Sequence, residues 1–302
     1  MSHRVHRSGR AARRPINRPS PSDHDPPGFA QLLADAVSLP GVVSHCYELF
    51  HAYSVGNQLA AWAQCLRRGI ALGPIHTFAG WLSVNRHVKR GEKALVLCMP
   101  VTWKPKSRLT DPADDTPAEL PSLRRAFVWR ANWFTLSQTE GADYRPLCVP
   151  QWDEVRALSS LTIERVSFAH ADGNVQGYAC ERKVAVSPIA HQAHRTLMHE
   201  VAHVVLGHTS QSSLADGSER TPRDLREVEA EATAYLVCQS LQLDDGVFSR
   251  GYLQHWLGKH AIDDRTARRV FHAADQILRA GRPEPTAAPD VPAEPSRSHP
   301  VS

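Results

Sequence analysis

The segment from 197 to 208, LMHEVAHVVLGH, places the spacing H-E-x-x-H inside an apolar stretch. Residues four apart lie on one face of a helix, so His199 and His203 can direct two imidazole rings at one cation. Glu200 follows the first of them, where its carboxylate can reach a water bound to that cation. Gly207 is expected to end the helix. The spacing predicts a metal centre that activates water for peptide hydrolysis, and the alternative is a helix with solvent-facing histidines.

A catalytic zinc usually has three protein ligands, so a third donor must come from another segment. Residues 223–242, RDLREVEAEATAYLVCQSLQ, are predicted to form a helix with one apolar side. At about 100° per residue, Glu229 and Glu231 flank that apolar side at comparable angles, and Glu227 lies further out. Each glutamate is also consistent with a solvated helix face. The periodicity therefore does not choose the third ligand.

The chain of 302 residues is long enough for two domains, and its charge changes sign along the sequence. Residues 1–150 contain 19 Lys and Arg against 11 Asp and Glu, whereas residues 151–302 contain 16 against 20. A basic half and an acidic half indicate different partners. Residues 1–28 are predicted to be a disordered basic arm and residues 283–302 a disordered tail. Residues 105–121 are expected to form a loop within the first domain.

The cysteines and the apolar runs indicate the compartment. The six cysteines stand far apart without a C-x-x-C pair, which argues against a disulfide framework and against a cysteine zinc site. No apolar run approaches the roughly 18–20 residues that a bilayer crossing needs, and the N-terminal residues lack the apolar core of a signal peptide. We therefore expect a cytoplasmic protein with no membrane partner.

The basic half is predicted to contain helices followed by strands. Ser54 can cap a helix that ends at Gly69, and a second helical segment is expected around residues 78–88. After the basic turn KRGEK come two segments typical of β-strands, at 94–101 and 126–136.

Most of the tryptophans lie in this basic half, beside cationic side chains. Five of the seven occupy positions 62, 81, 103, 129 and 133. Exposed bases of an unpaired strand stack on aromatic rings while Lys and Arg neutralise the phosphates, so this composition favours binding of single-stranded DNA. The alternative is that the tryptophans belong to the core and the basic turn is a solvated edge.

Three segments of the second half are KVAVSP at 183–188, HRTLMHEVAHVVLGHT at 194–209 and EVEAEATAYL at 227–236. Together they resemble the metallopeptidase half of the ArdC-like antirestriction family, which is related to the ImmA/IrrE-type metallopeptidases. The resemblance implies that Glu231 is the third metal ligand. It also implies that residues 184–187 form the edge strand beside the metal-binding helix, where an extended peptide can add itself by backbone hydrogen bonds.

The first half contains YSVGNQLAAWAQ, GPIHTFAGW and RHVKRGEKA between residues 53 and 94, and FTLSQTEG at 134–141. These segments are similar to the N-terminal single-stranded-DNA-binding domain of the same family, and the two resemblances cover about residues 29–260 in the family's order. The side chains predicted to contact DNA are Tyr53, Asn57, Gln58, Trp62, Trp81, Arg86, Lys89, Arg90 and Lys93.

The sequence therefore predicts an α+β protein with two domains: a single-stranded-DNA-binding module at 29–150, and a mainly helical, zincin-like metallopeptidase domain with a small sheet at 151–282. The expected cofactor is Zn²⁺, held by His199, His203 and Glu231, with Glu200 as the catalytic base. The expected partners are single-stranded DNA and a protein or peptide substrate. The resemblance implies an antirestriction role that protects incoming unpaired DNA.

Two other functions are consistent with the same residues. One is a protein that only masks single-stranded DNA and keeps the zincin half as a metal-stabilised scaffold, and the other is a regulatory peptidase that cleaves a repressor. A peptidase also needs a group that stabilises the oxyanion. The candidates are Tyr178, His191, His194 and Tyr235.

Overall fold

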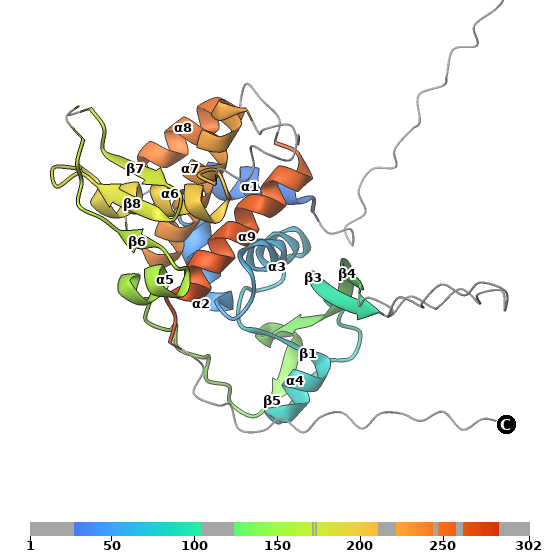
Figure 1. Ribbon diagram of the computed structural model, residues 1–302. Coiled ribbons are helices and arrows are strands. Elements are labelled where there is room, and N and C mark those ends of the chain that lie inside the picture. The colour runs from blue at the N-terminus through green and yellow to red at the C-terminus, as the bar shows by residue number, and fades with distance from the viewer. Residues whose placement is uncertain are drawn as a thin grey trace, which may run out of the picture.

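The computed structural model describes residues 27–103, 124–170, 172, 174–210, 222–243, 247–257 and 262–283. The basic arm up to residue 26, the loop predicted at 105–121 and the tail from residue 284 lie outside these ranges. The described part is α+β, with most helices in one central group and three small sheets on either side of it (Figure 1). No helix in it has both the length and the apolar character that a bilayer crossing requires.

The second half is built around a central helix, α7, whose residues from 228 to 240 are all buried. Helices α6, α8 and α9 surround it, and α5 packs on α9 (Figure 1). The bounds are α5 Glu154–Ser160, α6 Ala193–Val205, α7 Arg223–Leu241, α8 Val247–Leu257 and α9 Asp264–Ala280. The helices predicted around the H-E-x-x-H segment and at 223–242 are thus confirmed, and Gly207 takes the left-handed conformation just beyond α6.

A three-stranded sheet lies beside α6. Its strands are β6 Glu164–Arg165, β7 Gly177–Cys180 and β8 Lys183–Val186. The order is β6-β8-β7, with β8 parallel to β6 and antiparallel to β7. The prediction that residues 184–187 form the edge strand is therefore wrong, because β8 has a partner on both sides. β7 is the edge strand next to α6.

The first half begins with three helices and continues into two small sheets. Its elements are α1 Phe29–Ser38, α2 Val42–Phe50, α3 Val55–Arg68, β1 Ile75–Thr77, α4 Phe78–Ser83, β2 Arg86–Val88, β3 Leu95–Trp103, β4 Arg124–Thr135, the 3-10 turn Leu136–Gln138 and β5 Thr139–Gly141. One antiparallel sheet has the order β1-β4-β3, and β2 pairs with β5.

The predicted helix between Ser54 and Gly69 is confirmed as α3, with Gly69 in the left-handed conformation at its end. Both predicted strands are confirmed as β3 and β4. The second helical segment is shorter than predicted, because α4 ends at Ser83 and the chain turns at Asn85, where φ is 57°. A left-handed residue ends a helix and lets the chain reverse into β2.

Helices from the two halves share one core. The backbone N–H of Val55, at the start of α3, donates to Asp275 of α9 at 2.8 Å, and the Tyr235 hydroxyl of α7 donates to the carbonyl of Ala36 in α1 at 3.0 Å. Buried apolar side chains form a continuous cluster from Phe29 to Leu278. The chain crosses from one half to the other after β5, and the division near residue 150 into two domains stays a prediction.

Two side-chain amides of α3 satisfy the free edge of β3. Asn57 Nδ2 donates to the carbonyl of Cys98 at 2.8 Å while its Oδ1 accepts from the N–H of Cys98 at 2.8 Å. Gln64 makes the same pair of bonds to Val96, at 2.8 and 2.9 Å. A strand edge presents unpaired donors and acceptors, so these amides take the place of a further strand and dock α3 against the sheet.

Replacing Gln64 with leucine is expected to destabilise the fold by about 1–3 kcal/mol, because the edge N–H and C=O of Val96 lose their partners. Urea unfolding followed by circular dichroism measures the change. Gln31→Leu removes an exposed amide whose side chain bonds only within α1 and is the matched control, with an expected change within about 0.5 kcal/mol. Equal effects of the two substitutions would contradict this role of Gln64.

Candidate metal centre

Three donor atoms from α6 and α7 converge at one point. His199 Nε2 lies 3.1 Å from His203 Nε2, and Glu227 Oε2 lies 3.4 Å from the first and 3.5 Å from the second. The donor atoms of these three residues all lie within 4.8 Å of one another. Two imidazole nitrogens and a carboxylate oxygen are a donor set that suits a divalent transition metal, and the half-exposed Glu227 leaves the site open to solvent.

Glu231 occupies a different position, behind the ring of His199. Its Oε2 accepts from His199 Nδ1 at 2.9 Å, and its Oε1 accepts from Arg195 Nε and Nη2 at 3.0 and 2.5 Å. Arg195 Nε also donates to Ser249 of α8 at 2.7 Å. Both oxygens of Glu231 therefore have partners, and the structure brings Glu227 rather than Glu231 to the two Nε2 atoms. A carboxylate at Nδ1 fixes the ring and leaves Nε2 free for a cation.

A second chain of hydrogen bonds lies behind His203. His203 Nδ1 is 3.0 Å from His208 Nδ1, and His208 Nε2 is 3.0 Å from Glu229 Oε2. The other oxygen of Glu229 pairs with Arg269 Nη1 of α9 at 3.1 Å. Glu229 is fully buried, and the His208 side chain is only 4% exposed. Glu229 was among the glutamates considered as a third ligand, whereas here it lies behind His203, and His208 was not predicted to be part of the site although it belongs to the quoted segment.

These contacts determine which ring nitrogens carry protons. Burial lowers the pKa of His208, so its ring is neutral and has one N–H. The Glu229 carboxylate accepts from His208 Nε2–H, so His208 Nδ1 is an acceptor and His203 Nδ1–H must donate to it. Glu231 likewise accepts from His199 Nδ1–H. Both histidines are thereby held as the tautomer whose Nε2 lone pair faces the centre.

The electrostatics of the centre favour a bound cation. Burial opposes protonation of His199, but hydrogen bonds to Glu227 and Glu231 and the negative charges of Glu231 and Glu200 outweigh it and raise the His199 pKa to about 9. Hydrogen bonds from His199 and His203 hold the pKa of Glu227 well below its ordinary value. The carboxylates thus create a negative potential at the centre, and a proton on His199 compensates for it when no metal is bound. The residues present fit a divalent metal ion.

Glu200 lies beside the three donors and is not one of them. Its side chain is buried on the face of α6 that packs against β7, where a Cβ on Gly177 would come within 3.1 Å of Glu200 Cγ. Burial raises the pKa of Glu200, and the charges of His199 and His203 oppose this shift. A carboxylate with a raised pKa is a stronger base than an exposed one and so accepts a proton more readily, as a general base requires.

Several of the predicted DNA contacts hold the first half together. The Tyr53 hydroxyl donates to the carbonyl of Ile75 at 2.9 Å, and Gln58 Nε2 donates to the carbonyl of Tyr53 at 2.8 Å. Trp62 and Trp81 are buried, and Trp81 Nε1 donates to the carbonyl of Phe134. Asn57 satisfies β3, as described above. These five side chains are therefore used in hydrogen bonds and packing within the protein.

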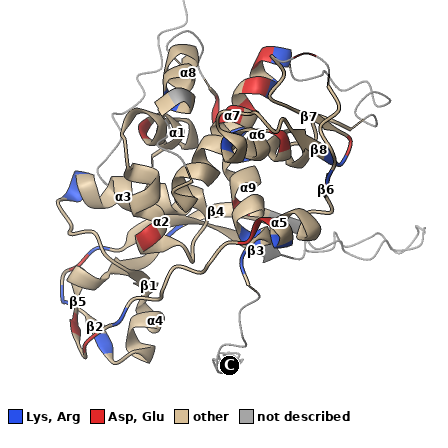
Figure 2. Ribbon diagram, turned by 90° about the vertical axis from the view of Figure 1, so that its left-hand side faces the viewer, with Lys and Arg blue, Asp and Glu red and all other residues tan. Residues whose placement is uncertain are grey.

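The cations of the motif lie nearer to solvent. Arg86 donates to Thr139 Oγ1 at 2.9 Å and to the Thr139 carbonyl at 3.1 Å, which joins β2 to β5. The side chains of Lys89, Arg90 and Lys93 are exposed on the segment between β2 and β3, here called the basic turn. Figure 2 shows blue segments around β2 and β5. Lys89 Nζ also donates to the carbonyl of Ser137 at 2.8 Å.

The four candidates for an oxyanion partner are spread over the second half. Tyr235 is buried, and its hydroxyl donates to a carbonyl of α1. His191 and His194 are exposed before and at the start of α6, and Tyr178 on β7 stacks on a phenylalanine. On α8, burial and then the charges of Glu227 and Glu231 raise the pKa of Tyr252, so its hydroxyl lies within electrostatic range of the centre. The sequence gives no signal for Tyr252, whose position depends on how α8 packs.

The fold and the site together define an α+β protein with a cluster of two histidines and a glutamate suited to a divalent metal. No family model matches the chain, and no curated protein matches it. Two crystal structures of the antirestriction ArdC protein from R388 plasmid are similar to it. The Mn(II)-bound structure has a TM-score of 0.49 and 19% identity, covering 84% of this chain and 96% of that chain. The metal-free structure has a TM-score of 0.45 and 16% identity, covering 84% and 94%.

Glu227→Ala is expected to lower the affinity for a divalent metal by more than about 100-fold, whereas Glu231→Gln lowers it by about 10–100-fold, because Glu231 only orients His199. Competition with a chromogenic chelator measures both affinities. Asp224→Ala, an exposed acid one turn earlier on α7, is the matched control and is expected to bind normally. A larger loss for Glu231→Gln than for Glu227→Ala would place Glu231 among the ligands.

His208→Leu is expected to lower the metal affinity by about 10–100-fold, because His203 Nδ1–H loses its acceptor and the ring loses its fixed tautomer. His255→Leu changes an exposed histidine of α8 and is the control. Unfolding of both variants with chelator present separates metal binding from stability. If His208→Leu destabilises the metal-free protein and leaves the affinity unchanged, the hydrogen-bond chain has only a structural role.

Proposed function

We propose that this chain binds single-stranded DNA and carries a zinc-dependent peptidase centre that hydrolyses peptide bonds of DNA-associated proteins, with an antirestriction role. The observation that carries the proposal is the convergence of His199, His203 and Glu227 beside the buried carboxylate of Glu200. The resemblance of both halves to the ArdC-like family, in the family's order, supports the DNA partner and the antirestriction role. Zn²⁺ is the metal that this donor set most often holds in peptidases, with two histidines and a glutamate.

Bound Zn²⁺ would supply a water of lowered pKa and polarise the peptide carbonyl. Glu200 takes a proton from the attacking water and afterwards donates it to the leaving amine. Its raised pKa suits both steps. Glu231 and His208 keep the two histidine rings in their orientation throughout, through the bonds at Nδ1.

The substrate is an extended peptide aligned along β7. This strand pairs with β8 on one side, and its Gly177 packs against α6 at Glu200. A peptide that adds to the free edge of β7 forms backbone hydrogen bonds without regard to sequence, which places a peptide carbonyl close to the end of the Glu200 side chain. Glycine at 177 permits the close packing of β7 against α6, since a Cβ there would lie 2.7 Å from Thr196 Cγ2.

DNA binds through the basic turn. Lys89, Arg90 and Lys93 present three cations within five residues of exposed chain, and phosphate contacts of this kind supply affinity that falls with salt. DNA held there brings proteins bound to the same strand near the metal centre and raises their effective concentration.

One experiment compares the zinc-loaded protein with Glu200→Gln and with Lys89→Gln/Arg90→Gln/Lys93→Gln, by cleavage of labelled casein and by DNA anisotropy. Glu200→Gln is expected to lose about 10²–10⁴-fold in cleavage rate and to keep zinc and DNA binding. The triple variant is expected to lose DNA affinity and to flatten its salt dependence by about 0.7 per lost phosphate contact.

Two results would contradict the proposal. Absence of cleavage by the zinc-loaded protein, together with full DNA protection by Glu200→Gln, identifies a DNA-masking protein with a structural metal. Unchanged DNA affinity of the triple variant removes the basic turn from the DNA site.

A further inference from the structure

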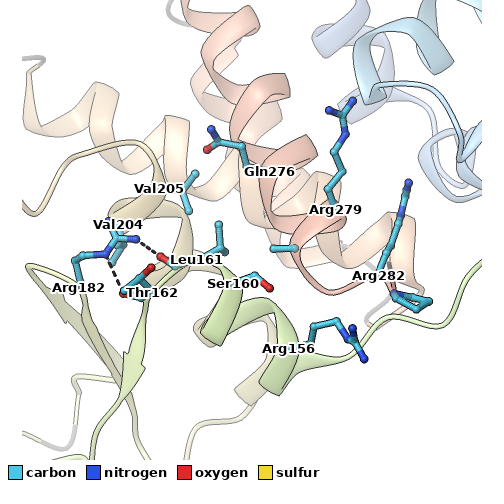
Figure 3. Close-up of a pocket in the computed structure, with 12 residues that line it drawn as sticks. Arg156, Ser160, Leu161, Thr162, Arg182, Val204, Val205, Gln276, Arg279 and Arg282 are labelled. Carbon is cyan, nitrogen blue, oxygen red and sulfur yellow. Dashed lines mark hydrogen bonds between the residues drawn. The ribbon is translucent and has the colours of Figure 1, made fainter. Parts of the chain in front are cut away.

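An open cleft of about 1020 Å³ lies in the second half, apart from the metal centre. It is formed by α5, the end of α6, the turn before β8 and the end of α9 (Figure 3). Val204 and Val205 line it, and they follow His203 on α6. At 100° per residue, they are turned about 100° and 200° away from the ring that faces the metal.

Four arginines line the cleft, and no carboxylate is among its described lining residues. Figure 3 shows Arg182 on one side and Arg156, Arg279 and Arg282 on the other. Within the described ranges none of the four is in an ion pair. The charges of Arg279 and Arg282 act on Asp275, but its carboxylate is partly buried and accepts from the backbone N–H of Val55.

The helix ends at the cleft do not cancel this charge. Three helices, α5, α6 and α9, end there, and each C-terminus carries about half a negative charge. Their sum is about −1.5 against four guanidinium charges, so the cleft stays positive.

The four guanidinium groups differ in the hydrogen bonds that they make within the protein. Arg182 donates to the carbonyls of Leu161 and Thr162, and Arg282 donates to the Tyr47 hydroxyl at 3.0 Å. Arg156 and Arg279 have exposed side chains, and no hydrogen bond of their guanidinium groups is found among the described residues. These two are therefore available to a ligand, with the first two setting the potential.

We propose that this cleft binds the phosphodiester backbone of single-stranded DNA, as a second contact beyond the basic turn; the proposal rests on the proposed function. The cleft has no aromatic ring among its described lining residues, so bases find no surface to stack on and the contact is made to phosphates. Its volume is at the upper end of pockets for small ligands, about 300–1,000 Å³, which suits a strand that passes through.

The hydroxyls of Ser160 and Thr162 and the amide of Gln276 supply uncharged donors along the same surface. Contacts of this kind position a strand without reading its sequence. A strand held here lies against the side of α6 opposite to the metal ligands, so DNA contacts both halves of the molecule.

The test uses the full chain with Arg156→Gln/Arg279→Gln, and anisotropy of a labelled oligothymidylate over a range of salt concentrations. The slope of log affinity against log salt is expected to fall by about 0.7 for each lost contact, about 1.4 in all. Arg223→Gln/Arg265→Gln removes the same charge from exposed positions on α7 and α9 outside the cleft and is the matched control, with an unchanged slope.

A slope for the cleft variant equal to that of the control overturns the proposal. The Lys89, Arg90 and Lys93 variant is measured in parallel and reports on the basic turn alone, so failure of the proposed function is read separately. Thymidine triphosphate is used as a second ligand. If the cleft variant loses binding of the triphosphate and keeps the oligonucleotide slope, the cleft is a mononucleotide site and the proposal is overturned.

Discussion

Two histidine nitrogens facing each other at 3.1 Å are the constraint on which the second half depends. Two lone pairs cannot approach this closely without a proton or a cation between them, because both carry negative charge density. The approach is maintained from outside, by acceptors at the Nδ1 atoms of both rings. Glu231 and His208 thus hold the two imidazole rings in the orientation that metal binding requires, whether or not a metal is bound.

Helix α7 supplies the three carboxylates around the metal centre, from every second residue between 227 and 231. Glu227 reaches the centre itself, Glu231 one turn later reaches His199, and Glu229 reaches His203 through His208. Burying two of them costs a large desolvation energy, which each offsets with a cation: Arg195 for Glu231 and Arg269 for Glu229. The surrounding helices are needed because those partners come from α6 and α9, with Ser249 of α8 bonded to Arg195.

The sequence predicts this site in part, and the limit is physical. The spacing of His199, Glu200 and His203 is set by one helix, so the local period suffices to predict which side chains lie together. The choice among the glutamates depends on how α7 is rotated against α6, and a rotation of tens of degrees exchanges a ligand for its neighbour. Since α7 is buried on every side, its apolar pattern does not indicate that rotation. The family resemblance implied Glu231 as the ligand, whereas the geometry brings Glu227 to the histidines.

The strands show the same division. The residue pattern of β3 and β4 is local, and it predicted both strands. Strand order depends on which strands pair, which no local pattern shows, and for this reason β8 was predicted to be the edge strand when the edge strand is β7. In the first half the motif residues were read as DNA contacts, although an amide such as Asn57 serves equally well to satisfy a strand edge. Residue type alone does not separate these uses, because both need a donor beside an acceptor.

Continuous packing connects the two halves. Asn57 and Gln64 dock β3 on α3, Asp275 of α9 accepts from the first N–H of α3, and Arg269 of the same α9 pairs with Glu229 behind the metal ligands. Such a path transmits a signal only if one of its members has two arrangements. Among these residues, Asp275 can change its charge near physiological pH, since burial raises its pKa to about 6 and the hydrogen bond from Val55 opposes the shift. Its protonation weakens this one hydrogen bond between α3 and α9 but also removes a charge that burial disfavours, so protonation as pH falls through about 6 favours the folded state as a whole.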